Sequence, residues 1–596
     1  MNTRLRGTRT LVTTSIEATW PESEPVTFLG EWCRRFVRRE RWESMDARVV
    51  PFHWDDRARL ASDAEYLDRR YEDLLAELTE LMGEVHGLDR SARYWRILLG
   101  PWLYRAIHLV FDRWQSVEAA MDDDLSQTLV LPVEYEVPAG MGEFGAIGTS
   151  ELGSHLVFAR LIREQTDLPV IELKPVEGMC LYPESPVPLS QRSVKERLLR
   201  SYSYLAGSLT RQTDGLIFAS FMRWRDVMDT TRRLGQVPQF WRDIPPVEAV
   251  EISTELRSRF ALGRDGSAFG ECLAEMIPWL LPSGYLEGFG RLRGQIADLA
   301  WPSDPKVILT SNPHGYDVFN AYAAEAVDRG TPYVVCAHSG QHGMLRWFWM
   351  EDHERRIADR YVTWGWGDEA DPQVRNVGYF RARRPVGVDH ASQDHLYMVL
   401  WACRQPSLQA RSELLGRQWL DYFEDHVRLV ELLPAAVREA MKVRLHANDR
   451  GWDQKERWRD RCPDVELDEG RGPLEDHLRS TRLYIATYLG SNNLESMVMG
   501  IPTIMFWRPE HWELRESAQH WFTELERVGV FHATPESAAA HVARVWDDVG
   551  GWWESDEVVA VVEPFVAHYC PLHEGLSRRM AGVLREAIGA GSDSSG

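Results

Sequence analysis

The sequence predicts an α/β protein with two Rossmann-like domains that face each other across a cleft. Its 596 residues exceed the roughly 250–300 residues that one hydrophobic core serves. Strand-like apolar runs alternate with helical stretches in both halves, which is the pattern of parallel βαβ units. A unit of strand, polar cap, helix, Gly-X-Pro and strand occurs at 307–337 and again at 483–506. The two copies indicate two similar sheets.

The strand and helix patterns set the domain boundaries that we expect. The N-terminal domain covers 1–365 and contains a helical insertion at about 58–122, where Leu, Tyr and Trp recur at three- and four-residue spacings. Residues 366–394 are rich in Gly, Pro, Asp and Arg and form the predicted linker. The C-terminal domain covers 395–588, and the small polar residues of 589–596 form a disordered tail. The expected strands are 10–16, 128–133, 169–173, 215–219, 307–310 and 333–336 in the first domain and 396–400, 442–445, 483–486 and 503–506 in the second.

Composition narrows the class of partner. The formal net charge is −22, which disfavours attraction to nucleic acid or to an anionic membrane surface. The seven scattered cysteines form no CxxC pair, so we expect neither a disulfide framework nor a zinc knuckle. No apolar run reaches the roughly 18 residues of a membrane span, and the N-terminus lacks the apolar core of a signal peptide. We therefore expect a cytoplasmic protein that is at most peripheral to the membrane and has no nucleic-acid partner.

The segment 488–496 is the strongest candidate for a nucleotide site. A predicted strand ends there, Gly490 allows a close turn, and Ser491 or Asn492 caps the next helix. The first amides of that helix are a ready phosphate site, and the carboxylate of Glu495 is placed to accept from a ribose hydroxyl. The alternative is an ordinary helix start with a glutamate in its first turn.

A second polar segment follows the predicted strand at 442–445. Arg444 and His446 are two residues apart, so they share one face of the strand and both can address one phosphate. The alternative is a structural salt bridge and a surface histidine.

Two histidines and two glycines follow the predicted strand at 333–336. Gly340 and Gly343 allow the backbone to approach a ligand, and His338 can hold a phosphate or carry a proton. Zinc binding by His338 and His342 is the alternative. An HxxxH pair is aligned by a helix, and the intervening glycines argue against one, so we expect no metal here.

Glu31 is the candidate general base on the acceptor side. It lies between glycine and tryptophan on an early loop, where partial desolvation would raise its pKa. The alternative is a carboxylate on a surface loop. The aspartates at 122–124 end a helical run rather than follow a strand, so they do not resemble a DxD metal site, and we expect no metal or cofactor. The signatures of P-loop, HExxH, kinase and GxSxG enzymes are missing as well.

Short segments of the N-terminal half carry a resemblance to a known family. They are LVTT at 11–14, WP at 20–21, FLGEWC at 28–33, HWDD at 53–56, RYWRILLGPW at 93–102 and DRW at 112–114. Together they resemble a family of transferases first noted in a leptospiral O-antigen cluster and associated with surface-polysaccharide biosynthesis. The resemblance covers nearly the whole chain. The C-terminal half of that family is similar to GT-B enzymes such as Kdo transferases and capsule synthases.

The resemblance implies a GT-B glycosyltransferase with a nucleotide sugar and a glycan or small-molecule acceptor as substrates. His338, Gly340 and Gly343 match an HGGxxG-like segment of the family, although Ser339 stands where glycine is usual and His342 where an aromatic residue is usual. The family's donor-loop region is matched by Ser491, Asn492, Asn493 and Glu495.

The expected reaction is an inverting, metal-independent glycosyl transfer. A CMP-activated ulosonic acid is the preferred donor, followed by UDP- or dTDP-hexose. Glu31 is the leading candidate base, and His338 stabilises the leaving phosphate or replaces Glu31 as base. The alternatives are a sugar-nucleotide epimerase or hydrolase of the same architecture and a nonenzymatic scaffold of polysaccharide assembly. The helical segment at 58–122 favours the transferase over the epimerase, because it adds a surface for an acceptor.

Overall fold

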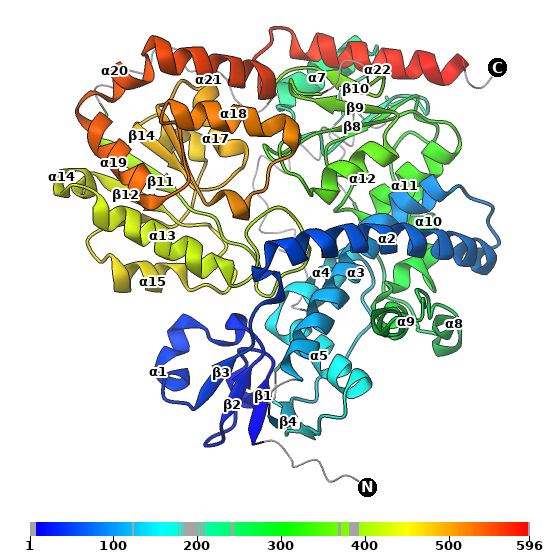
Figure 1. The fold of residues 1–596 in the computed structure, drawn as a ribbon. Helices are drawn as coiled ribbons and strands as arrows, with labels where there is room; N and C mark the ends of the chain where they lie inside the picture. The colour runs from blue at the N-terminus through cyan, green and yellow to red at the C-terminus, as the bar shows by residue number, and fades with distance from the viewer. Residues whose placement is uncertain are drawn as a thin grey trace.

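The described part of the chain forms three parallel β-sheets with helices around them (Figure 1). The computed structural model describes residues 8–121, 124–176, 178–179, 181–182, 202, 206, 209–239, 244–367, 371–380 and 393–593. The strand orders are β3-β2-β1-β4-β5, β10-β9-β8-β7-β6 and β13-β12-β11-β14-β15-β16, and neighbouring strands pair in parallel throughout. The predicted α/β class with Rossmann-like parallel sheets is thus confirmed.

The strands are short and mostly buried. The first sheet contains β1 (Arg9–Val12), β2 (Val26–Phe28), β3 (Ala47–Val49), β4 (Leu125–Val130) and β5 (Val170–Glu172). The second contains β6 (Leu216–Phe218), β7 (Ile308–Thr310), β8 (Tyr333–Cys336), β9 (Arg360–Thr363) and β10 (Val374–Asn376). The third contains β11 (His395–Val399), β12 (Met441–Arg444), β13 (Glu466–Asp468), β14 (Thr481–Ala486), β15 (Thr503–Phe506) and β16 (Phe531–His532).

Two sheets, rather than one, lie N-terminal to the predicted linker. The predicted helical insertion corresponds to α2 (Arg57–His86) and α3 (Ala92–Ala120), which connect β3 to β4. The side chain of Asp56 caps α2, and Ser91 caps α3. Because α3 is apolar on nearly all sides, it packs against α5 beside the first sheet and against α11 and α12 beside the second. These long helices therefore separate the two sheets (Figure 1).

The other α-helices surround the sheets. Around the first two sheets they are α1 (Arg39–Trp42), α4 (Met141–Thr149), α5 (Glu151–Gln165), α7 (Trp224–Arg233), α8 (Thr254–Ser258), α9 (Ala268–Leu280), α10 (Phe289–Ala297), α11 (Asp317–Asp328) and α12 (Trp349–Ile357). Those after β11 are α13 (Gln418–Leu432), α14 (Ala435–Glu439), α15 (Gln454–Arg461), α16 (Leu474–Leu478), α17 (Ser491–Val498), α18 (Glu516–Arg527), α19 (Pro535–Val545), α20 (Val549–Trp553), α21 (Asp556–Tyr569) and α22 (Leu576–Asp593).

The repeated αβ unit is present in the second and third sheets. Gly330 and Gly500 follow α11 and α17 with φ of +98° and +76°, the left-handed conformation that ends a helix. The next strands, β8 and β15, pair with β7 and β14. A loop precedes both helices. It is shorter before α17, which begins at Ser491 after β14 ends at Ala486, than before α11, which begins at Asp317 after β7 ends at Thr310.

The C-terminal helix α22 returns to the second sheet. It packs against α7, where the Ser577 hydroxyl donates to Asp229 at 2.5 Å. It also extends through Asp593, into the segment predicted as a disordered tail. Strand β10 falls within the predicted linker, while 368–370 and 381–392 of that linker lie outside the described residues, as do Asp122 and Asp123.

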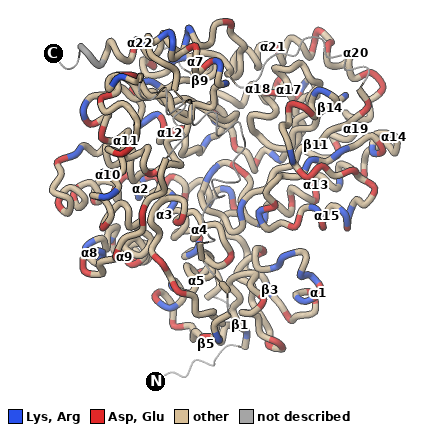
Figure 2. Tube along the Cα trace, turned by 180° about the vertical axis from the view of Figure 1, so that it is seen from behind, with Lys and Arg blue, Asp and Glu red and all other residues tan. Residues whose placement is uncertain are grey.

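Acidic and basic residues are interspersed along the whole trace (Figure 2). Among the described residues, no helix is long and apolar enough to cross a membrane.

Candidate active site

The two glycine loops singled out in the sequence meet between the second and third sheets. The amide of Gly340 donates to Oγ of Ser491 at 3.1 Å. A Cβ atom at Gly340 would lie 2.4 Å from the carbonyl oxygen of Gly490, so the close approach requires glycine. The loop after β8 and the start of α17 therefore form one site at the carboxyl ends of their strands, where open α/β sheets bind ligands.

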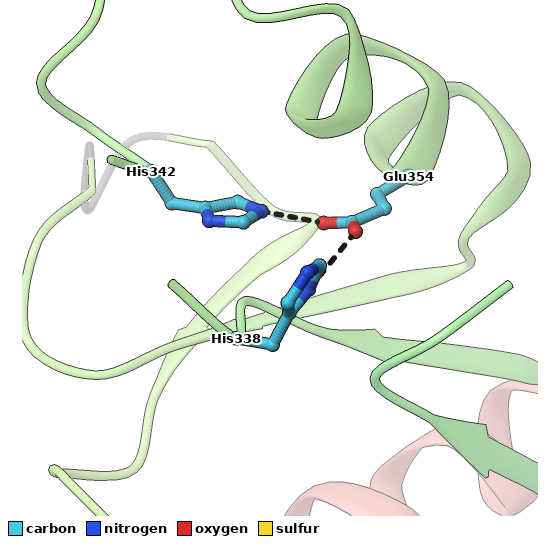
Figure 3. A group of neighbouring side chains, drawn as sticks. All are labelled: His338, His342 and Glu354. Carbon is cyan, nitrogen blue, oxygen red and sulfur yellow. Dashed lines mark hydrogen bonds and ion pairs between the residues drawn. The ribbon is translucent and has the colours of Figure 1, made fainter. Parts of the chain in front are cut away.

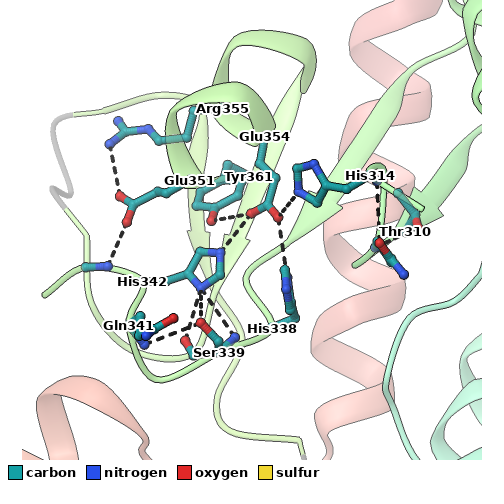
Figure 4. Close-up of polar contacts among 12 residues, drawn as sticks. Thr310, His314, His338, Ser339, Gln341, His342, Glu351, Glu354, Arg355 and Tyr361 are labelled. Carbon is teal, nitrogen blue, oxygen red and sulfur yellow. Dashed lines mark hydrogen bonds and ion pairs between the residues drawn. The ribbon is translucent and has the colours of Figure 1, made fainter. Parts of the chain in front are cut away.

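A buried carboxylate organises the histidines of this site (Figures 3 and 4). Glu354 lies on α12 and is fully buried. Its Oε1 is 2.9 Å from Nε2 of His314 and 3.3 Å from Nδ1 of His338. Its Oε2 is 3.0 Å from Nε2 of His342 and accepts from the hydroxyl of Tyr361 at 2.9 Å. We refer to Glu354, His314, His338, His342 and Tyr361 as the Glu354 cluster.

Burial and charge set the protonation states in the Glu354 cluster. Burial alone would raise the pKa of Glu354, but the surrounding histidines hold it well below its usual value. Burial disfavours the charged form of His342, yet the charge and hydrogen bond of Glu354 raise its pKa. For His314 burial prevails and lowers the pKa. The cluster therefore holds an ionised glutamate that His342 neutralises.

His338 is the histidine of the cluster that reaches solvent. Its side chain is 18% exposed, against 4% for His314 and 0% for His342. Because Nδ1 faces Glu354, Nε2 lies on the opposite edge of the ring. This is the arrangement by which a carboxylate orients a catalytic imidazole.

The same residues are the candidate metal ligands of the described chain. Ligand atoms of His338, His342 and Glu354 lie within 4.8 Å of one another. The glycine-containing turn brings the two histidine rings to 4.9 Å, so the expectation that only a helix would align them is wrong. Both carboxylate oxygens of Glu354 already have two partners each, so its hydrogen bonds are satisfied without an ion.

The residues of the 490–495 segment divide into structural and accessible ones. Gly490, not Ser491 or Asn492, is the N-cap of α17, and its amide donates to Oδ1 of Asn493 at 3.1 Å. The side-chain amide of Asn492 donates to the hydroxyl of Tyr484 at 2.5 Å inside the core. Ser491 contacts the Gly340 loop, and half-buried Glu495 accepts from the Tyr379 hydroxyl at 2.7 Å.

Arg444 and His446 have different surroundings. Arg444 is buried and forms an ion pair with Asp468 at 3.1 Å, and it also donates to the carbonyl of Gly472 at 2.6 Å. These contacts correspond to the structural salt bridge named above as the alternative. His446 is half-buried beside Trp401, whose ring lies 5.0 Å from that of Tyr488, so His446 borders the 488–496 segment.

Glu31 lies in a short 3₁₀ helix, Glu31–Cys33, that follows β2 of the first sheet. Both of its carboxylate oxygens accept from Arg34, at 2.6 Å each. The positive charge of Arg457 on α15 also acts on it. The structure thus places Glu31 in an ion pair near the third sheet, whereas His338, Gly340 and Gly343 lie on the loop that contacts α17.

The sequence pattern did not indicate three residues of the cluster, Glu354, His314 and Tyr361. Glu354 occupies one position on an amphipathic helix, where a glutamate is normally a solvated residue. A usable signal was present, because His314 and His338 each follow a strand of one parallel sheet by a few residues. Their convergence at the carboxyl edge could have been inferred from that placement.

A cavity of about 930 Å³ adjoins His338 on the side of β6. Phe221 lines it, is 49% exposed, and has its ring 5.6 Å from that of His338. Trp224 and Tyr316 also line the cavity and are 56% and 38% exposed. Exposed aromatic faces suit the binding of a sugar ring.

Comparisons with known proteins give the family. Among the similar solved structures, TarM is 11% identical over 47% of this chain and 51% of its own, with a TM-score of 0.26. The wall teichoic acid polymerase TagF is 10% identical over 67% of this chain and 96% of its own, with a TM-score of 0.32. S. aureus MnaA in complex with UDP is 11% identical over 63% of this chain and 97% of its own, with a TM-score of 0.34. The match thus spans about half the length of TarM. No curated protein matches. The sequence profile of the LIC12162 family of transferases matches residues 9–581. The chain therefore belongs to this family of transferases, as the resemblance implied.

Proposed function

We propose that this transferase is an inverting GT-B glycosyltransferase that moves a sugar from a nucleotide-activated donor to a glycan or small-molecule acceptor of surface-polysaccharide synthesis. The observation that carries the proposal is the contact between the Gly340 loop and Ser491. Through this contact, the loop that carries His338 touches a helix N-terminus that suits a phosphate group. A CMP-activated ulosonic acid remains the preferred donor, with UDP- or dTDP-hexose next.

The donor phosphate is assigned to the N-terminus of α17. The first amides of a helix have no partners within the helix, and its dipole favours an anion. Glu495 lies one turn into α17 at the edge of the site, where its carboxylate accepts from a ribose hydroxyl as it accepts from Tyr379 in the unliganded chain.

The catalytic base is assigned to His338 in preference to Glu31. In a single displacement, the acceptor oxygen forms a bond to the anomeric carbon while its proton passes to Nε2 of His338. The bond from that carbon to the phosphate oxygen breaks, and the nucleotide leaves with the electron pair. Glu354 acts as a positioning residue that holds the imidazole ring and stabilises its charged form. The carboxylate of Glu31 already forms an ion pair with Arg34, which makes it less available to an acceptor hydroxyl.

Release of nucleotide from a panel of donors, with and without polysaccharide acceptors, tests the proposal. Removing a general base lowers turnover by about 10²–10⁴-fold and leaves donor binding nearly intact. We expect this result for His338→Ala, and near-normal turnover for Glu31→Gln. The reverse result would restore Glu31 as the base, and two active variants would refute both assignments.

Acceptor dependence separates the alternatives. Nucleotide release that is independent of any acceptor would identify an epimerase or hydrolase. A protein that no member of the panel CMP, UDP, GDP and dTDP stabilises thermally would be a scaffold, because a ligand at 100 times its dissociation constant adds roughly 2.7 kcal/mol to the free energy of unfolding.

A further inference from the structure

A second cavity, of about 300 Å³, is lined by four arginines. It lies where α3, α4 and α12 meet the segment 401–416 that follows β11 at its carboxyl end. The arginines are Arg105 on α3, Arg404 and Arg411 on the 401–416 segment, and Arg450 after β12. One carboxylate, Glu413, also lines the cavity. We call this cavity the arginine pocket.

Two carboxylates offset part of the positive charge of the arginine pocket: Glu413 lines it, and the charge of Asp317 acts on Arg105. Arg411 pairs with Glu413. Arg105 and Arg404 have no hydrogen bond or ion pair with another described residue, although Arg404 is exposed to solvent. The buried Nε atom of Arg450 has no partner either. Desolvation and the like charges of the other arginines lower the pKa of Arg404 to about 10, so it stays charged at neutral pH. Clustering like charges is unfavourable unless an anion binds among them.

The walls of the pocket are held in place independently of any ligand. Arg113 of α3 donates to the carbonyl of Ser407 at 2.6 Å, and His108 of α3 accepts from the amide of Ala410 at 3.0 Å. The indole of Trp452 donates to the carbonyl of Cys403 at 2.9 Å. These contacts fix the backbone that carries Arg404 and Arg411, so a ligand would meet preorganised donors.

Backbone strain at Arg450 supports a functional role. Its φ is +60°, a left-handed conformation that is strained for a non-glycine residue and that recurs at ligand sites. This conformation accompanies the entry of its side chain into the cavity.

The arginine pocket adjoins the candidate active site. Glu413 accepts from the side-chain amide of Gln341, in the loop that contains Gly340, at 3.5 Å. Trp401, another lining residue, has its ring 5.0 Å from Tyr488 and 5.3 Å from His446. A group bound in the pocket would therefore be near the start of α17 without occupying it.

We propose that the arginine pocket binds a phosphate or diphosphate group of a substrate. Guanidinium groups bind phosphate oxygens in pairs and remain charged at any physiological pH, and several such groups match an anion of more than one charge. The group has two sources, the phosphate (CMP donor) or diphosphate (UDP or dTDP donor) of the activated sugar, or a phosphate on the acceptor. Only this choice of substrate rests on the proposed function, because the anion site itself is argued from the arginines.

Calorimetric titration of the full chain with inorganic pyrophosphate tests the proposal. We expect saturable binding that weakens as salt rises, and at least tenfold weaker binding in Arg404→Gln and in Arg450→Gln. The matched control is Arg461→Gln, which removes an arginine that pairs with Glu424 on the surface, and it should bind as the unaltered chain does. Failure of the unaltered chain to bind pyrophosphate, or equal binding by all variants with unchanged melting temperatures, would overturn the proposal.

Competition identifies the source of the group. Displacement of pyrophosphate by CMP, UDP, GDP or dTDP would assign the pocket to the donor, and simultaneous binding of pyrophosphate with each of these nucleotides would assign it to a phosphorylated acceptor. The proposed function fails separately: arginine-dependent pyrophosphate binding without transfer from any donor keeps the pocket and removes the glycosyltransferase. Sugar transfer from a donor, without arginine-dependent pyrophosphate binding, would keep the proposed function and remove the arginine pocket.

Discussion

At Gly340 the loop after β8 contacts the start of α17. A methyl group there would meet the carbonyl of Gly490 at 2.4 Å, so Gly340→Ala must move the loop that carries His338. A displacement of about 1 Å in an active site can lower turnover by about 10²-fold, and we expect a loss of that order in initial-rate assays. Gly582→Ala is the control, because nothing lies within 4 Å of the Cβ atom that it adds. Normal turnover in Gly340→Ala would show that the contact has no catalytic role.

Substitution of Glu354 is expected to lower the stability of the fold. Glu354→Gln keeps the shape of the side chain but leaves the charged form of His342 buried without its counter-charge. Breaking a buried pair in this way costs about 3–5 kcal/mol of unfolding free energy, which denaturant unfolding would measure. Glu574→Gln, on the surface, should be neutral. An unchanged free energy of unfolding in Glu354→Gln would mean that the cluster does not hold an ionised carboxylate.

Helix α17 is the element to which nucleotide binding is assigned. Glu495→Ala removes a charged hydrogen-bond acceptor worth about 1.5–3 kcal/mol, so the dissociation constant for the donor nucleotide should rise by about tenfold or more. Isothermal titration with the best-binding nucleotide measures it. The control is Glu516→Ala, which removes an exposed acidic residue from the first turn of α18. Equal affinities in the two variants would argue against the α17 site.

At the scale of the whole molecule, histidines buried in uncharged form make the fold sensitive to acid. Burial lowers the pKa of His108 from 6.5 to about 3. The unfolded chain therefore binds the proton first, and stability falls as pH drops below 6.5, by about 1.4 kcal/mol per pH unit for each such histidine. We expect the melting temperature to fall between pH 7 and pH 5, and to fall less in His108→Gln. A melting temperature that stays constant over this range would contradict the assignment.

Metal dependence is also a property of the whole enzyme. The Glu354 cluster satisfies its carboxylate with protein donors, so we expect turnover to survive dialysis against EDTA. Metal analysis of the purified protein is the independent measurement. Loss of turnover in EDTA that zinc, magnesium or manganese restores would identify His338, His342 and Glu354 as ligands instead.

Local features of the fold followed from the sequence. The α/β alternation, the long helices α2 and α3, and the glycines that end α11 and α17 are set by side-chain periodicity and by backbone conformation within a few residues. The division of the N-terminal half into two sheets did not follow. A strand such as β4 carries no local mark of its partners, and pairing with β1 joins residues that are far apart in the chain.

The sequence by itself determined the class of fold, the glycine loops at 340 and 490, and the family resemblance, because each depends on residue types at fixed local spacings. Only the tertiary structure decided which polar side chains are available for chemistry. It joined His338 to Glu354, engaged Arg444 with Asp468 and Glu31 with Arg34, and gathered the arginine pocket from separate segments. The physical reason is that burial and charge pairing depend on neighbours in space, and long-range packing sets those neighbours.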